Sequence, residues 1–197
     1  MKKRIRLSFN APVVLWFAII CTAVTLLNYL TKGAANQVIF STYHSSLASP
    51  LTYLRFLTHV FGHGDWSHLV GNMTYLLLLG PMLEEKYGSK TLVEVIAITA
   101  VVTAVANYLL FPMVALCGAS GVVFAFILMS SFTSFKDGEI PLTFILVVVF
   151  FLGREIIDGI FVSDQISNFA HIVGGIIGGL AGYGLNVKSR HKSDHYR

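Results

Sequence analysis

The sequence predicts an all-helical membrane protein with six transmembrane helices. The chain has 197 residues, of which 55% are hydrophobic and only 12% charged, whereas soluble domains carry about 25% charged residues. The mean hydropathy is +0.71. The apolar residues gather in long runs, and each bilayer crossing needs roughly 20 of them. The length therefore allows five or six crossings and little else, which predicts a single integral membrane domain over residues 1–197.

Six apolar segments are expected to cross the membrane. The first follows a basic amino terminus (1–10), as in a signal peptide, but it exceeds the roughly 7–15 apolar residues of such a segment, so we expect it to be retained. Charged residues or a helix breaker such as Pro112 separate the later segments. The expected spans are 11–30, 67–83, 92–111, 120–135, 140–157 and 166–187.

The distribution of basic residues predicts the orientation. With the amino terminus inside, all of the 14 lysines and arginines except Lys32, Arg55 and Arg154 fall in cytoplasmic segments, including the tail 188–197. Because positive charge favours the cytoplasmic side, both termini are expected to be cytoplasmic. The net charge of +4 lies at span ends rather than on a patch, so a nucleic-acid partner is not expected.

Two parts of the chain depart from a simple series of spans. Residues 31–66 are too polar to cross a bilayer, but apolar residues recur at helical spacing within 50–61, which predicts a short helix at the membrane interface. The fourth span is preceded by the small, polar stretch Cys117-Gly118-Ala119-Ser120-Gly121. We therefore expect a short helix that begins below the outer surface, a backbone arrangement tolerated only inside protein or beside a water cavity.

Ser120 is the first candidate for chemistry. At the start of a helix, free N–H groups and the positive end of the helix dipole favour developing negative charge, which suits a nucleophilic serine. Serine is also a favoured helix cap, so a purely structural role stays open from this loop alone.

His171 is the candidate base. It precedes Gly174, Gly178 and Gly182, a stripe of small residues that lets helices pack closely. If spans four and six meet along this stripe, His171 comes within reach of Ser120, and a buried neutral imidazole can accept the serine proton. A histidine that only hydrogen-bonds to a neighbouring helix is the alternative.

His68 and Asn72 are four residues apart and share one face of the second span. Both can donate hydrogen bonds without a fixed charge, as an oxyanion hole requires, although a structural pair is equally compatible. No carboxylate is positioned to complete a triad, which favours a dyad. His59, His63 and His68 are close in sequence, but Gly62 and Gly64 interrupt any helix there, so neither a metal site nor another cofactor is predicted.

With these residues identified, the chain resembles the rhomboid family of intramembrane serine proteases, in its compact six-span bacterial form. Three motifs carry the resemblance in the family's order: His68-x-x-x-Asn72, Gly118-x-Ser120-Gly121, and Ala170-His171-x-x-Gly174-x-x-x-Gly178. The resemblance implies a rhomboid-like six-helix bundle located in the bacterial inner membrane.

The resemblance also implies residue roles. Ser120 would be the nucleophile and His171 the general base, while the Ser120 N–H, His68 and Asn72 would stabilise the oxyanion. The residues expected to support this site are Gly118, Gly121, Phe124, His59, His63, Gly174 and Gly178. Two positions depart from the family pattern: Leu54 precedes Arg55 where tryptophan is frequent, and Phe124 replaces a tyrosine that stacks on the histidine.

The predicted function is intramembrane proteolysis by a Ser120–His171 dyad. The implied partners are single-span membrane protein substrates and the lipid bilayer, while the sequence leaves the oligomeric state open. Two alternatives are an inactive rhomboid-like protein that binds membrane clients and a small transporter. The six spans show no internal two-fold repeat of the kind transporters often have, and both dyad positions are occupied.

Overall fold

The computed structural model describes residues 9–134, 139–153, 157 and 165–194, and these residues are almost entirely helical. They contain no named strand, and Thr42 and Leu116 form an isolated antiparallel bridge. Short π or 3-10 helices cover Asn36–Phe40, His59–Phe61, Phe132–Ser134 and Val148–Leu152. The α-helices are α1 (Pro12–Leu30), α2 (Pro50–Thr58), α3 (Trp66–Tyr87), α4 (Ser89–Leu110), α5 (Ser120–Ser131), α6 (Leu142–Val147) and α8 (Gln165–Asp194).

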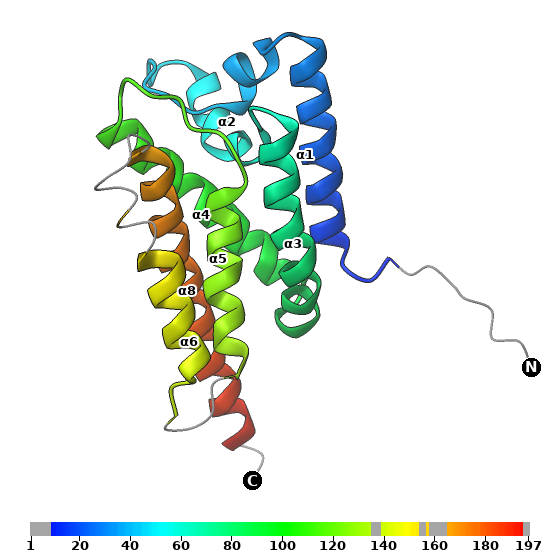
Figure 1. Ribbon diagram of the computed structural model, residues 1–197, viewed down its shortest axis with the longest axis vertical. Coiled ribbons are helices and arrows are strands. Elements are labelled where there is room, and N and C mark those ends of the chain that lie inside the picture. Colours follow the sequence, from blue (N-terminus) through cyan, green and yellow to red (C-terminus); the bar gives the residue numbers. More distant parts are fainter. Residues whose placement is uncertain (1–8, 135–138, 154–156, 158–164, 195–197) are drawn as a thin grey trace, which may run out of the picture.

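The helices form a bundle along the long axis of the molecule (Figure 1). Helix α1 leads to the end that carries α2, α3 returns, and α4 runs obliquely past α5 and α8. Helix α5 begins below the level at which α4 ends, and α8 packs against it along much of its length. The all-helical fold class is thus confirmed, and α2 occupies the region where the sequence predicted a short interfacial helix.

The helix bounds differ from the expected spans at several ends. Helix α3 continues to Tyr87, beyond the charged residues expected to end it. Helix α5 ends at Ser131, where the hydroxyls of Ser130 and Ser131 donate to the carbonyl of Ile127, and the segment beginning at 140 combines α6 with a π-helical turn. Helix α8 extends to Asp194, so most of the predicted tail is helical. By length and composition, α1 and α4 qualify as bilayer-crossing helices in the described part of the chain, and α5 is apolar but shorter. This test therefore supports two of the six expected crossings.

A buried carboxylate joins three helices at the end of the bundle where α1 begins. The two oxygens of Glu84 accept hydrogen bonds from the backbone N–H groups of Val13 (3.0 Å) and Val14 (3.1 Å). The Ser89 hydroxyl donates to the same carboxylate at 2.6 Å. Free N–H groups at a helix start favour a negative charge, so Glu84 caps α1 and ties it to the turn between α3 and α4.

Helices α5 and α8 approach each other closely because small residues line their contact. A methyl group added at Gly174 would overlap the backbone of Gly121, with the carbon of the Gly121 carbonyl only 2.8 Å away. Gly178 meets the backbone of Ala125 in the same way, and Gly182 meets the ring of Phe132. The glycine stripe predicted on the last span therefore faces α5.

Replacing Gly174 with alanine is expected to destabilise the fold. The added methyl group must push α8 away from Gly121, and overpacking of this kind costs about 1–3 kcal/mol. Thermal unfolding in detergent would measure the loss. Gly179→Ala is the matched control on the same helix, because its added methyl group would lie 3.9 Å from the Phe132 ring. Equal melting temperatures for the two variants would contradict the close α5–α8 contact.

Candidate active site

Ser120 is the first residue of α5 and is half-buried. Backbone hydrogen bonds fix the loop that precedes Ser120 to two other segments of the chain. Gly118 donates its N–H to the carbonyl of His59 at 2.9 Å, and Leu116 exchanges backbone hydrogen bonds of 2.9 and 2.8 Å with Thr42. Gly118 has a φ of +130°, a conformation that side chains rarely tolerate. The loop therefore presents Ser120 from a fixed backbone.

His68 and Asn72 lie against this loop from α3. Asp65 precedes this helix and caps it, because its carboxylate accepts the His68 N–H at 2.8 Å. A methyl group built on Gly118 would lie 2.9 Å from His68 Nε2 and 3.9 Å from Asn72 Nδ2. Gly118 is thus required both for its backbone angle and for the space that the His68 ring occupies. The structure therefore places the predicted pair, His68 and Asn72, against the predicted loop that precedes Ser120.

The Asn72 amide has unused hydrogen-bonding capacity. The side chain is 7% exposed, and its Nδ2 has no hydrogen-bond partner among the described residues. A buried donor without a partner costs roughly 1–3 kcal/mol, and such groups gather where a ligand or reaction intermediate supplies the missing acceptor. Asn72 therefore directs an available donor toward the loop that carries Ser120.

His171 approaches Ser120 from α8. The Gly121 backbone adjoins the Ala170 carbonyl oxygen, which would lie 3.5 Å from a methyl group on Gly121. Ser120 and His171 are each one residue from this contact. The imidazole of His171 stacks on the Phe124 ring, with centroids 4.3 Å apart and an interplanar angle of 5°. The stacked ring of Phe124 therefore helps to orient the histidine.

His59 and His63 are buried behind the same loop. Besides the bond from Gly118 to its carbonyl, His59 contacts the Thr103 hydroxyl through Nε2 at 3.3 Å. The Ala119 N–H donates to His63 Nε2 at 3.5 Å, and the His63 ring meets the His68 ring edge-on at 5.0 Å. Burial lowers the pKa of His59 to about 4. Burial, and secondarily the charge of His68, lowers the pKa of His63 to about 4.

The free energy of unfolding is expected to fall as pH drops from about 6.5 to about 4. Above this window both histidines are neutral in the folded and unfolded chain. Within it, the unfolded chain binds protons that the folded chain does not, at about 1.4 kcal/mol per pH unit for each histidine. Melting temperatures across this range would measure the loss. His63→Gln cannot titrate and should reduce the slope by about 1.4 kcal/mol per pH unit, whereas an unchanged slope would contradict the assignment.

A polar stripe on α4 supports the site and was not identified from the sequence. Thr99, Thr103 and Asn107 are spaced four residues apart and are all buried. Thr103 contacts His59, and the Asn107 amide donates to the carbonyls of Val114 (3.1 Å) and Thr42 (3.4 Å). The signal was present, because this spacing puts three polar residues on one face of an apolar helix.

Arg55 anchors the segment between α1 and α2, although Leu54 stands before it where tryptophan is frequent. It is 7% exposed, donates from Nε to the carbonyl of Val38 at 2.9 Å, and its guanidinium lies 4.4 Å from the centre of the Tyr43 ring. Leu54 is 44% exposed and does not share this role. A cation over an aromatic face is stabilising, so the anchoring is concentrated in Arg55.

The family model described as the Rhomboid domain matches residues 50–187, a range that contains the whole site. The chain belongs to the rhomboid family. The resemblance carried by the three motifs is therefore confirmed, and family membership makes this rhomboid an integral membrane protein. It also supports a function of the intramembrane-protease type.

Three curated relatives are similar to this rhomboid. The rhomboid protease GlpG of Haemophilus influenzae is 25% identical, over 89% of this chain and 93% of its own. Rhomboid-like protein 11, chloroplastic, of Arabidopsis thaliana is 26% identical over 86% of this chain and 57% of its own. Rhomboid-related protein 2 of Mus musculus is 30% identical over 70% of this chain and 52% of its own. This rhomboid thus spans about half the length of the latter two.

Proposed function

We propose that this rhomboid is a serine endopeptidase that cleaves membrane-spanning segments of other proteins through a Ser120–His171 dyad. The observation that carries the proposal is the meeting of three helices at one backbone turn. Gly118, just before α5, adjoins His68 and Asn72 of α3, and Gly121 in the first turn of α5 adjoins the Ala170 carbonyl of α8. One turn further along α5, Phe124 stacks on His171. A nucleophile, a base and neutral donors are the groups that acyl transfer requires.

In the first half of the reaction, the Ser120 hydroxyl oxygen attacks the carbonyl carbon of the scissile peptide bond. His171 accepts the hydroxyl proton as the new C–O bond forms. The tetrahedral intermediate collapses when the C–N bond breaks, and His171 returns the proton to the leaving amine. In the second half, water loses a proton to His171 and hydrolyses the acyl-serine ester, which regenerates Ser120.

The negative charge of the tetrahedral intermediate would be stabilised by the Ser120 N–H, His68 and Asn72. Two observations support this role: Asn72 Nδ2 has no hydrogen-bond partner among the described residues, and His68 lies near Gly118. Neutral donors suit a site of low dielectric constant, where a fixed charge would be costly. Gly118, His59 and His63 would hold the loop, while Gly121, Gly174, Gly178 and Phe124 would position His171 beside it.

We further propose that residues 1–197 form one membrane domain with six crossings and both termini in the cytoplasm, in the inner membrane of a bacterium. Substrates would be single-span proteins. The basic residues at the segment ends support the orientation. The course of the described helices supports an even number of crossings, because α1 and α8 run in opposite directions along the bundle (Figure 1).

A fluorophosphonate probe tests the proposal directly. The purified protein should become labelled, and labelling should block cleavage of a fluorescent single-span substrate in detergent or vesicles. Cys117→Ala is the control: it should retain both labelling and cleavage, because burial raises the pKa of the Cys117 thiol and keeps it a poor nucleophile. A folded protein that binds the substrate but is neither labelled nor active would overturn the proposal in favour of a binding function.

A further inference from the structure

An apolar groove lies between α1 and α4, and none of its lining residues belongs to the candidate active site. It has a volume of about 400 Å³ and is lined by side chains of α1, of α4 and of the segment from α2 to Phe61. Every lining residue is apolar. They include Val13, Trp16, Leu57, Phe61 and Ala97.

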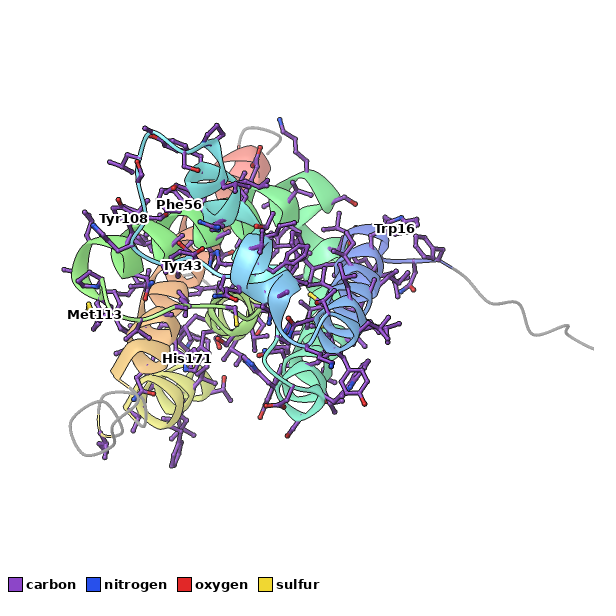
Figure 2. All side chains as sticks on the ribbon, turned by 90° about the horizontal axis from the view of Figure 1, so that it is seen from above. Trp16, Tyr43, Phe56, Tyr108, Met113 and His171 are labelled. Carbon is purple, nitrogen blue, oxygen red and sulfur yellow. The ribbon has the colours of Figure 1, made fainter. Side chains whose placement is uncertain are left out.

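Two contacts hold together the segments that line the groove. At one end, Glu84 binds the Val13 N–H and the Ser89 hydroxyl, which draws together the starts of α1 and α4. At the other end, the Phe61 ring lies 5.0 Å from the Phe17 ring of α1. Trp16 is 57% exposed and lies at the rim of the bundle (Figure 2). The opening therefore faces outward between α1 and α4, the two described helices that qualify as bilayer-crossing.

The size and chemistry of the groove restrict its occupant. Apolar cavities stay dry and bind apolar ligands, so water and polar headgroups are excluded. A partner helix is about 10 Å wide, and about 400 Å³ would hold only about one turn of it. A single extended hydrocarbon chain is narrow enough to lie along the groove. In a membrane protein, the surrounding bilayer supplies such chains at high concentration.

We propose that this groove binds one acyl chain of a membrane phospholipid. The acyl chain lies between α1 and α4, against Trp16 and Ala97. Leu57 and Phe61 lie above it. The segment that covers it also supports the candidate active site, because His59 precedes Val60 and Phe61 and its carbonyl holds the Gly118 N–H. If the proposed function holds, loss of the acyl chain loosens that loop and lowers activity, while binding itself does not depend on catalysis.

Trp16 allows the binding to be measured without a substrate. The chain has two tryptophans, so Trp66→Phe leaves Trp16 as the sole indole reporter, and adding Ser120→Ala removes the proposed catalysis. This protein, in detergent, is titrated with a phosphatidylcholine brominated in one acyl chain, whose bromine atoms quench nearby indole fluorescence. Quenching is expected to saturate at one lipid per protein, and unbrominated lipid should reverse it.

Two half-buried alanines of α4 provide matched variants. Ala97→Phe fills the groove and should weaken saturable quenching at least about tenfold, a change of one decade in affinity. Ala106→Phe adds the same side chain outside the groove and should bind as before. Quenching that rises in proportion to lipid without saturating, or that is equal in both variants, would overturn the proposal. So would a dimer that Ala97→Phe dissociates, because the occupant would then be a second copy.

A cleavage assay separates this proposal from the proposed function. With Ser120 intact, Ala97→Phe should cleave a single-span substrate more slowly than Ala106→Phe, or should no longer respond to added phospholipid. Saturable lipid binding in a protein that never cleaves would leave the groove assignment intact and overturn the protease. Cleavage of the substrate without saturable lipid binding would leave the protease proposal intact and overturn the groove assignment.

Discussion

Ser120→Ala is expected to reduce substrate cleavage by at least about 1,000-fold, the loss expected when the nucleophile of a serine hydrolase is removed. The fold should be unaffected, because Ser120 is half-buried at a helix start and its neighbours Ala119 and Gly121 make the close backbone contacts. Cleavage of a labelled single-span substrate, measured beside the melting temperature, would separate chemistry from stability.

His171→Ala should lose activity to a similar extent, since the two residues act as one unit and their effects do not add. The double variant should therefore be no slower than either single variant. Phe124→Leu is the accompanying control, because it removes the ring that stacks on His171 but leaves both reacting groups, and it should retain measurable cleavage. Substantial cleavage by Ser120→Ala would refute the dyad.

Asn72→Ala is expected to lower kcat by about 100- to 1,000-fold, the usual effect of removing one oxyanion donor, and to leave KM nearly unchanged. The reason is that Nδ2 is a buried donor without a partner among the described residues. Its acceptor would appear only when the substrate carbonyl acquires negative charge. The kinetic parameters of purified enzyme would test this.

Two variants of α3 sharpen that test. Asn72→Asp preserves the size of the side chain but removes the donor, so it should be as slow as Asn72→Ala. Gly71→Ala changes the adjacent residue, where an added methyl group meets nothing within 4 Å, and should retain full activity. If Asn72→Asp cleaved at the normal rate, the amide would have a packing role instead.

Local pattern was sufficient to locate the candidate site residues. His68 and Asn72 share a helix face because they are four residues apart, and the glycines after His171 recur with the same period. The structure brings His68 and Asn72 against Gly118, just before Ser120, and Gly174 against Gly121, just after it. Helix ends were predicted less well: α3 continues through Glu84 and α8 through the basic tail, because charge alone does not end a helix.

Other features depend on contacts between distant segments. Glu84 is one of the charged residues that were expected to separate two spans, yet it caps α1 through Val13, 71 residues away. The regular spacing of the polar residues on α4 is visible in the sequence. Their hydrogen-bond partners in the loops around Thr42 and Val114 cannot be read from it. The spacing of residues within one helix does not indicate which other helix its face will contact.

The sequence by itself therefore determined the fold class, the family motifs and the identity of the candidate nucleophile, base and donors, because each rests on composition or on spacing within one helix. Only the tertiary structure decided how those residues meet. It brings Gly121 against Gly174 and Gly118 against His68, and it leaves an apolar groove between α1 and α4. These outcomes follow from the packing of side chains that lie far apart in the chain.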